Sequence, residues 1–406
     1  MVGVNNFGYE SSCTNLIKLK TSNDEFIIPV TLDLNQSTTT QIDFTLPDLL
    51  NNNQIKNYIE SITSTETDIF ISSSDGFSKI GKLYFENEVN ASRSDVKKFK
   101  INNLDYIKGY YKKKFSDNSS FNSELMGLNS FKDLINVPEI ISFDKDDLSI
   151  SIEEIKSPLF FDYLQQNNVD ENIFFKLVEE IALIGLQGKK RNVFSYVPKM
   201  DSENITGWFD NHLFKEINHT GNFDDLKKIC IDNLCSVSDE EIFYSKDVHS
   251  RNMLFDGKNI YHIDFEFSKY VAFQFELANA LEYEGMNLNN QFKEKLLKHF
   301  VFYVNDDKKI IESSDKFIEQ YYKVAFSKNI KSAITRAKWA MDYVDSFFNT
   351  SSKVDLENYH KFMSYKNIHL TQALNNDVAF KTTSTNDQII DLNQHFLKKK
   401  YLHVLF

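Results

Sequence analysis

Two neighbouring stretches, Tyr244-Ser-Lys-Asp-Val-His-Ser-Arg-Asn-Met-Leu-Phe255 and Tyr261-His-Ile-Asp-Phe-Glu266, decide how this chain is interpreted. They place Asp247 five residues before Asn252, and a second acid, Asp264, twelve residues after that amide. Phosphoryl transfer needs one carboxylate that orients the attacking hydroxyl and accepts its proton. It also needs an amide oxygen and a second carboxylate that hold Mg²⁺ on the nucleotide phosphates. The spacing therefore predicts a catalytic base at Asp247 and metal ligands at Asn252 and Asp264.

The residues between the amide and the second acid have the pattern of a β-hairpin. Met253-Leu-Phe255 is a short apolar run, Asp256-Gly257 is a strong turn signal, and residues 260–263 resume the strand pattern. A hairpin of this length brings its outer ends together, so Asn252 and Asp264 are expected to face one metal ion. The alternative is a surface hairpin with flanking acids in an acidic, Asn-rich chain.

The two stretches resemble the catalytic segment of the aminoglycoside phosphotransferase and choline kinase family, a small-molecule branch of the protein-kinase-like fold. That family reads roughly His-Gly-Asp-Leu-His-Pro-Gly-Asn, followed by hydrophobic-Ile-Asp-Phe/Trp-Glu. The matching residues are Asp247, His249, Asn252, Ile263, Asp264, Phe265 and Glu266. The resemblance implies an α+β fold of two lobes, in which a small antiparallel-sheet N-lobe precedes a larger helical C-lobe and the nucleotide lies between them.

The catalytic segment departs from the family pattern at several positions. Ser245 and Lys246 stand where the family has His and Gly, and Ser250 and Arg251 replace the Pro and Gly before the amide. The family's His is architectural, so its loss removes no chemical group. Lys246 is similar to the Arg that precedes the catalytic Asp in many protein kinases. Further along, Glu276-Leu-Ala278 stands where the family has Asp-Leu-Ala at a helix start.

The resemblance divides the chain into three parts. Residues 1–90 are expected to be an N-terminal extension of mixed structure, residues 91–156 the N-lobe, and residues 157–406 the helical C-lobe with the catalytic loop and the metal-binding hairpin. In the extension, residues 25–32 have the pattern of a strand and residues 46–62 the apolar spacing of a helix. The extension forms either a small domain or a decoration of the N-lobe.

The N-lobe is expected to supply a phosphate-binding Lys. Its pattern predicts two paired strands, with a turn at Asn102-Asn103, and then a helix: 96–101, 105–111 and 121–128. Lys108 sits where the family's third strand carries this Lys, and Glu124, on the helix, is placed to pair with it. Lys112 is the alternative, because a bulge at Gly109 would turn the two Lys side chains to opposite faces of the strand.

Two more N-lobe segments correspond to nucleotide contacts of the family. Residues 148–155 alternate apolar and polar side chains as a half-buried strand does. The end of this strand falls at the interlobe hinge, where the resemblance implies that backbone groups of Glu153 and Ile155 bind the adenine edge. Residues 90–95 correspond to the family's phosphate loop but contain small residues in place of Gly.

The C-lobe pattern predicts long helices. Apolar residues recur on one face over 173–184, and Gly188 suits a C-terminal cap. The basic cluster that follows, 189–192, is expected to be a solvated helix end, with a substrate-phosphate contact as the alternative. Residues 317–348 form a second helical pattern, broken near Ser327-Lys-Asn329. Trp339 and Tyr343, four residues apart on it, are either core residues or the wall of an acceptor pocket that holds a cation.

Composition and charge narrow the function further. The 406 residues carry a net charge of −12, which argues against non-specific binding of nucleic acid. A cationic substrate is compatible with this charge. No apolar run is long enough for a membrane span and no signal peptide is evident, so we expect a cytoplasmic location. The three cysteines, Cys13, Cys230 and Cys235, are expected to be reduced thiols.

The chain is therefore expected to be a phosphotransferase that moves the γ-phosphate of ATP or GTP to a hydroxyl of a small molecule, such as a sugar, an aminoglycoside or an amino alcohol, with Mg²⁺ as cofactor. Two alternatives stay open. Lys246 and the unfamiliar extension favour a kinase of a protein or a lipid-linked glycan. Ser245 and the Gly-free phosphate loop favour a pseudokinase binding module, against which the retention of Asp247, Asn252 and Asp264 argues.

Overall fold

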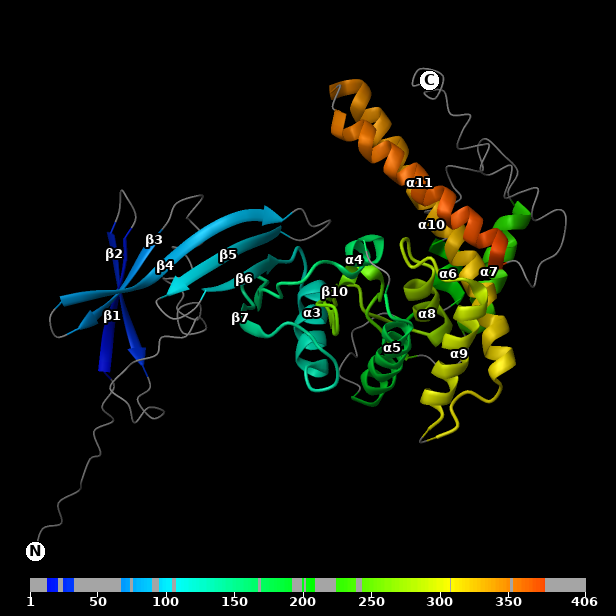
Figure 1. The fold of residues 1–406 in the computed structure, drawn as a ribbon, viewed down its shortest axis with the longest axis horizontal. Coiled ribbons are helices and arrows are strands. Elements are labelled where there is room, and N and C mark those ends of the chain that lie inside the picture. The colour runs from blue at the N-terminus through cyan, green and yellow to red at the C-terminus, as the bar shows by residue number, and fades with distance from the viewer. Residues whose placement is uncertain are drawn as a thin grey trace, which may run out of the picture. The chain divides into compact units, whose positions relative to one another are not determined.

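A computed structural model describes most of the chain, and it divides the chain into two compact units (Figure 1). One unit comprises Met1–Asn129 and Pro138–Ile155, and the other comprises Ser130–Val137 and Lys156–Phe406. The described residues are 13–20, 25–32, 67–73, 76–89, 95–103, 107–166, 169–191, 199–200, 202–208, 224–238, 243–306, 308–350 and 353–376.

The first unit is built on one antiparallel sheet of eight strands in the order β2-β1-β3-β4-β5-β6-β8-β7. The strands are β1 Cys13–Lys20, β2 Glu25–Leu32, β3 Thr67–Ser73, β4 Gly76–Val89, β5 Asp95–Asn103, β6 Ile107–Lys114, β7 Ile140–Asp144 and β8 Ser149–Glu153. The strand expected at 25–32 is confirmed, whereas the helix expected at 46–62 lies outside the described residues. Because β4 pairs with β5, the strands of the first ninety residues continue the sheet of the following segment. One helix, α3 (Asn118–Phe131), follows β6.

The pairing of β5 with β6 is regular, which corrects two details of the sequence analysis. The register runs without a shift past Gly109, so the bulge considered there is wrong, and Lys108 and Lys112 lie on one face of the strand. Gly109 instead makes room for Glu154, because a Cβ at this position would lie 1.9 Å from the Glu154 carboxylate. The predicted turn at Asn102-Asn103 is also wrong, since both residues are paired within β5.

The second unit is largely helical. Its helices are α4 Phe160–Gln166, α5 Glu171–Arg191, α6 Ser202–Trp208, α7 Asp224–Ser238, α8 Phe273–Leu281, α9 Asn290–Val304, α10 Ser314–Thr350 and α11 Lys353–Asn376. Its short strands pair as β9 Phe243–Ser245 with β12 Lys269–Val271, and as β10 Met253–Phe255 with β11 Ile260–His262. One apolar core joins α5, α7, α8, α9 and α10 to these strands. The small antiparallel sheet and the larger helical region confirm the expected fold class.

Two predicted helix ends are wrong, and both errors have a packing cause. Gly188 lies inside α5, where a Cβ would come within 2.3 Å of the Tyr244 side chain, so glycine serves a close approach rather than a cap. Helix α10 runs unbroken through Ser327 and Asn329. Buried partners satisfy both polar side chains: Asn233 donates to the Ser327 hydroxyl (3.2 Å), and Asn329 donates to Glu282 (3.1 Å).

The two cysteines of the second unit are free thiols, as expected. Cys230 is buried and Cys235 is half-buried. Burial raises the pKa of the Cys230 thiol to about 12.

Among the described residues, none of the helices combines the length and the apolar character that crossing a membrane requires.

Candidate active site

The loop that carries Asp247 is held from both sides by one buried carboxylate, that of Glu276 in the first turn of α8. Its Oε1 accepts hydrogen bonds from the backbone N–H groups of Lys246 (3.1 Å) and Val248 (2.9 Å). Its Oε2 accepts one from the Ser245 hydroxyl (2.7 Å). These bonds fix Asp247 at φ +65°, in the left-handed region. That region costs most residues roughly 1–2 kcal/mol, although Asp tolerates it better than most.

The two residues that differ from the family pattern at this clamp fit each other. Ser245 stands in place of the family's His, and Glu276 stands in place of its Asp. Glu is one methylene longer than Asp, and it reaches the shorter Ser side chain and both flanking N–H groups. Ser245 therefore has a structural role at the loop, so its presence in place of His does not favour the pseudokinase alternative.

The Asp247 carboxylate is oriented by Asn279, one helical turn after Glu276 on α8. Asn279 Nδ2 donates to Asp247 Oδ1 at 2.5 Å. On the main-chain side, Asn252 Nδ2 donates to the carbonyl oxygen of Asp247 (3.0 Å), which closes the loop on itself. With Oδ1 engaged, Oδ2 is the oxygen that can receive a proton from an acceptor.

The surroundings of Asp247 keep it ionised. Burial alone would raise the pKa of this carboxyl, but the nearby positive charges of Lys269, Lys328 and Lys331 hold the pKa well below its usual range. A carboxylate of this kind is a weak base at neutral pH. It is suited to orienting a hydroxyl and accepting its proton late in the reaction.

His249 is neutral at physiological pH, because burial lowers its pKa to about 4. Its Nδ1 accepts a hydrogen bond from the backbone N–H of Arg251 (3.3 Å), which assigns the ring proton to Nε2. That nitrogen lies 3.8 Å from Asp247 Oδ2, beyond hydrogen-bond distance. The ring stacks on Tyr283 with centroids 4.3 Å apart. The neutral His249 ring thus lies beside the Asp247 carboxylate without forming a hydrogen bond to it.

Lys246 ties the two ends of the hairpin together. Its side chain is fully buried, and Nζ donates to the carbonyl oxygens of Asn252 (3.1 Å) and Ile263 (2.8 Å). The ammonium group also lies 5.0 Å from the centre of the Phe265 ring. A side chain so enclosed cannot contact an acceptor, so Lys246 gives no support to a protein or glycan substrate.

The predicted hairpin is confirmed, and it brings the two proposed metal ligands to adjoining positions. Phe255 pairs with Ile260, and the backbone N–H of Ile263 donates to the carbonyl oxygen of Asn252 (3.1 Å). Asp264 follows at once, at φ +66°. Two residues of this loop system are therefore held in the left-handed region, and such conformations gather at functional sites.

The residues present fit a magnesium ion. Because Asn252 uses its Nδ2 on the Asp247 carbonyl, its Oδ1 remains as an oxygen ligand, and Asp264 adds a carboxylate. Mg²⁺ prefers such oxygens, and in kinases it takes only one or two protein ligands besides the substrate phosphates. A cluster of three or more His, Cys, Asp or Glu side chains suited to a metal does not occur in the described part of the chain.

Among the described side chains of the first unit, Glu124 lies beside Lys113. Glu124 is buried, and its Oε2 lies 3.7 Å from Lys113 Nζ. Lys112 lies on the opposite face of β6, 3.4 Å from Asp147. The side chain of Lys108 and the loop 90–94 lie outside the described residues.

The expected hinge lies at the end of β8. The backbone N–H of Glu153 donates to the carbonyl oxygen of Glu139 (3.0 Å), and its carboxylate accepts from the Glu139 N–H (3.2 Å). The neighbouring Glu154 N–H donates to the Gly109 carbonyl (3.0 Å). Ile155 ends the first unit.

Comparison with known proteins identifies the fold of this chain. No protein-family model and no curated protein matches the sequence. Among solved structures, a choline kinase from Cryptosporidium parvum Iowa II is similar with a TM-score of 0.50 and 14% identity, over 77% of this chain and 94% of that one. The chain has a choline-kinase-like fold.

Two other solved structures also resemble this chain. A choline/ethanolamine kinase family protein from Mesorhizobium loti has a TM-score of 0.47 and 9% identity, covering 76% of this chain and 92% of that chain. A spectinomycin phosphotransferase solved with ADP and spectinomycin has a TM-score of 0.47 and 13% identity, covering 73% of this chain and 94% of that chain.

Trp339 and Tyr343 pack against α11. Both rings contact Phe362, at 5.4 and 5.5 Å between centroids. The guanidinium group of Arg336 lies 4.5 Å from the centre of the Trp339 ring, so one face of this aromatic already carries a cation of the chain itself. Trp339 is 41% exposed and Tyr343 is half-buried, so neither is a fully buried core residue, although both pack against Phe362.

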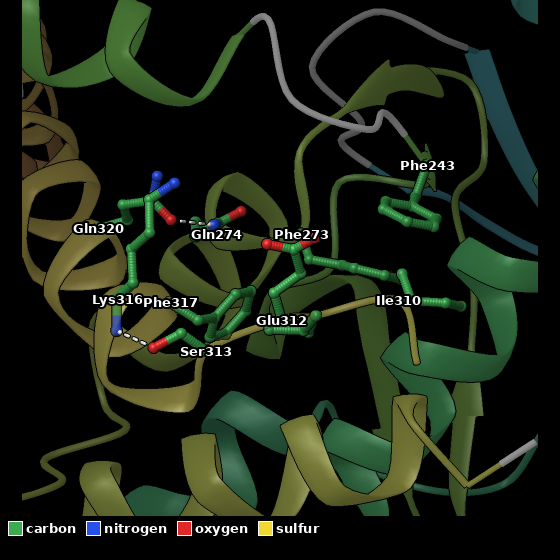
Figure 2. Close-up of a pocket in the computed structure, with 10 residues that line it drawn as sticks. Phe243, Phe273, Gln274, Ile310, Glu312, Ser313, Lys316, Phe317 and Gln320 are labelled. Carbon is green, nitrogen blue, oxygen red and sulfur yellow. Dashed lines mark hydrogen bonds between the residues drawn. The ribbon is translucent and has the colours of Figure 1, made fainter. Parts of the chain in front are cut away.

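Figure 2 shows a cavity of about 320 Å³ that contains none of the catalytic-loop residues. It is lined by the starts of α8 and α10 and the segment before α10: Phe243, Phe273, Gln274, Ile310, Ile311, Glu312, Ser313, Lys316, Phe317 and Gln320. Gln274 and Gln320 hydrogen-bond to each other across it (3.1 Å). Two of the polar side chains that line this cavity therefore hydrogen-bond to each other, and Asp247 is not among the lining residues.

Sequence reasoning missed several residues of the site. Glu276 was noted only as a motif position, and Asn279, Lys113 and the lysines around Asp247 were not singled out. One signal was available: Glu276 and Asn279 are three residues apart, and so are Lys328 and Lys331, which places each pair on one helix face. The signal becomes informative only when it is known which face meets Asp247.

Proposed function

We propose that this chain is a phosphotransferase that moves the γ-phosphate of ATP or GTP to a hydroxyl of a small molecule. The observation that carries the proposal is the state of Asp247. Its carboxylate is ionised, and its backbone is held in the left-handed region by the Glu276 clamp. It also lies on the loop that Asn252 closes, beside the hairpin that leads to Asp264. The choline-kinase-like fold supports the same reaction class.

In this mechanism Asp247 Oδ2 accepts a hydrogen bond from the acceptor hydroxyl and aims its oxygen at the γ-phosphorus. A new P–O bond forms as the bond to the leaving nucleoside diphosphate breaks, and the hydroxyl proton passes to Asp247. Because the pKa of Asp247 is low, this transfer comes late, when the acceptor oxygen already carries positive charge. Asn279 and the Glu276 clamp keep the carboxylate in place throughout.

Asn252 and Asp264 would hold Mg²⁺ through their side-chain oxygens. The ion, when bound, neutralises charge on the transferring phosphates. Their position at the two ends of one hairpin, cross-linked by Lys246, holds the ligands at a fixed separation.

For the nucleotide phosphates, the resemblance points to Lys108, and the ion pair favours Lys113. Lys113 is proposed because a Glu-positioned ammonium is the arrangement that phosphoryl transfer uses, and Glu124 makes that pair with Lys113. Glu153 and Ile155 remain the proposed backbone contacts of the base. Lys113→Met is expected to weaken nucleotide binding or turnover at least tenfold, with Lys112→Met as the matched control. A loss in Lys108→Met alone would return the role to Lys108.

The deciding experiment is a nucleotide-consumption screen with ATP and GTP over a library of hydroxyl compounds, with and without Mg²⁺, with products identified by mass spectrometry. Phosphorylated products that require Mg²⁺ are expected. Nucleotide binding without turnover of any compound would instead favour a pseudokinase.

The metal assignment is tested separately by nucleotide affinity as a function of Mg²⁺. Asp264→Asn is expected to lose most of the Mg²⁺ dependence, because it removes a charged ligand while Asn still tolerates the left-handed backbone. Asp256→Asn, at the turn of the same hairpin, is the matched control, since Asn preserves the turn's acceptor oxygen. An unchanged Mg²⁺ dependence in Asp264→Asn would reject the site.

A further inference from the structure

Three lysines converge beside the catalytic loop from two elements of the second unit. Lys269 lies in β12, and Lys328 and Lys331 lie one turn apart on α10. We refer to these three residues as the lysine cluster. They line one small cavity together with Met200, Leu234, Phe275, Glu276 and Asn279. All three lysine side chains are half-buried, so they remain accessible to a solute.

The lysine cluster is connected to the catalytic carboxylate through one side chain. Lys328 Nζ donates to Asn279 Oδ1, and Asn279 Nδ2 donates to Asp247 Oδ1 (2.5 Å). Lys269 is joined to the same loop through the pairing of β12 with β9, where it lies opposite Ser245. A group bound by the cluster would therefore lie within a few side-chain lengths of the attacking hydroxyl.

The positive charges of the cluster oppose one another. Burial, and then the charge of Lys269, lowers the pKa of Lys331 to about 8, and burial with the charges of Lys331 and Lys269 lowers the pKa of Lys328. The acids that face the cluster are Asp247 and Glu276. The oxygens of Glu276 serve the loop, and Asp247 is the proposed base. An anion bound beside the three ammonium groups would interact favourably with all of them and reduce their mutual repulsion.

Among the described aromatic residues near the cluster, Tyr283 and Trp339 already have partners on their ring faces. Tyr283 is stacked by His249 at 4.3 Å, and Arg336 lies 5.7 Å from the Tyr283 ring centre and 4.5 Å from that of Trp339. Aromatic recognition of an ammonium group needs open ring faces, and it is weakened by an adjacent guanidinium. The Arg336 guanidinium group therefore already lies beside both the Tyr283 and the Trp339 rings.

We propose that the acceptor is an anionic hydroxyl compound, whose phosphate or carboxylate group binds the lysine cluster while its hydroxyl faces Asp247. This inference rests on the proposed kinase function and narrows its substrate class. The cavity holds only about 20 Å³, little more than a water molecule, so the anionic group binds at its mouth, where the lysine ammonium groups reach it. Lysine is suited to this role as a compact point charge with three donors.

A binding experiment tests the anion site without relying on turnover. Inorganic phosphate and glycerate are titrated calorimetrically into nucleotide-free wild-type protein and into Lys331→Gln, Lys331→Arg and Lys323→Gln. We expect Lys331→Gln to weaken binding of at least one probe about 10- to 100-fold, since it removes a charge-assisted hydrogen bond. Lys331→Arg is expected to retain most of the affinity.

Lys323 is the matched control in this titration. It lies on the same helix and pairs with Glu319 (2.7 Å), away from the cavity lining, so Lys323→Gln is expected to bind like the wild type. Equal binding in wild type and Lys331→Gln, or no binding of either probe to wild type, would overturn the proposal. The ratio between phosphate and glycerate decides which anionic group the site prefers.

A turnover experiment then compares acceptors that differ in charge: glycerol, glycerol 3-phosphate, glycerate and choline. Anionic acceptors are expected to give the highest kcat/KM, and Lys331→Gln is expected to raise their KM about 10- to 100-fold with little change in the KM of the nucleotide. A change in the nucleotide KM instead would assign the cluster to the nucleotide and overturn the proposal. Lys331-dependent phosphate binding without turnover of any acceptor would retain the anion site and reject the kinase function.

Discussion

Two buried glutamates that lie close together in the chain, Glu276 and Glu282, use the same functional group to bind different kinds of donor. Glu276, in the first turn of α8, accepts only neutral donors: two backbone N–H groups and the Ser245 hydroxyl. Glu282, just after α8, accepts hydrogen bonds from four side chains, one of them an ammonium group: Lys293, Tyr321, Asn329 and Asn376.

The difference lies in what each carboxylate joins. The donors to Glu282 come from α9, α10 and the end of α11, where α11 returns alongside α10 (Figure 1), so this residue joins several helices at one point. The donors to Glu276 all belong to one loop. We infer that Glu282 holds the fold together, whereas Glu276 sets the geometry of Asp247. Activity and stability should therefore respond separately to substitutions at the two positions.

The largest expected effect is on turnover, from Asp247→Asn. Asn is nearly isosteric and tolerates the positive φ of this position, so the fold should be kept while the proton acceptor is lost. Loss of a general base typically costs about 10²- to 10⁴-fold in kcat. Steady-state kinetics and nucleotide titration are the measurements, and nucleotide affinity should stay close to that of the wild type. Turnover near the wild-type rate would remove Asp247 from the mechanism.

The next effect is on stability, from Glu282→Gln. It leaves the buried ammonium of Lys293 without its charged partner, which lies at 2.7 Å in the wild type. Breaking a buried ion pair on one side costs about 3–5 kcal/mol. Urea unfolding should show this loss, while kcat of the folded fraction should change little. A variant as stable as the wild type would contradict the structural role of Glu282.

The matched substitution Glu276→Gln should reverse this pattern. One oxygen remains to accept from the loop, and no cation is hydrogen-bonded to Glu276, so the loss of stability should be about 1 kcal/mol. The loop would be held less firmly, and we expect kcat to fall roughly tenfold, since small misplacement of a reacting group is costly. If Glu276→Gln were the less stable variant and Glu282→Gln the less active one, the comparison would be inverted.

The smallest effect is a pH dependence of acceptor use. For an anionic acceptor, kcat/KM reports the free enzyme, in which Lys331 has a pKa of about 8. Lys269, Asp247 and Arg336 face Lys331, together with Lys328 on the same helix. Lys331 is protonated below its pKa and neutral above it, so kcat/KM should fall as pH rises past about 8.

Lys331→Arg is the control for this profile, because Arg stays charged over the whole range. The fall in kcat/KM above pH 8 should be reduced in this variant. If kcat/KM fell in the same way with choline as acceptor, or if the pH profile of Lys331→Arg matched that of the wild type, the lysine cluster would not be the cause of the pH dependence.

Sequence patterns predicted the parts of the site that depend on neighbours in the chain. The spacing of Asp247 and Asn252 and the hairpin from Met253 to Ile263 are local, because a turn at Asp256-Gly257 and two short apolar runs suffice to form it. The helical patterns over 173–184 and 317–348 followed from apolar periodicity in the same way, whereas the helical lobe as a whole was implied by the family resemblance. The errors arise where a local rule has a competing cause: Gly188 fits the pattern of a helix cap, but it lies inside α5 and makes room for Tyr244.

The sequence by itself determined the order and spacing of Asp247, Asn252 and Asp264, and its resemblance to a kinase family implied the fold class. Only the tertiary structure decided that Glu276 clamps a loop thirty residues earlier, that Glu124 meets Lys113, and that Lys269, Lys328 and Lys331 surround one cavity. The reason is physical: periodicity shows which residues share a face of a helix or strand, but not which distant element that face meets. That choice is made by the packing of whole helices and by the register of the sheet, where a shift of one residue reverses every side chain.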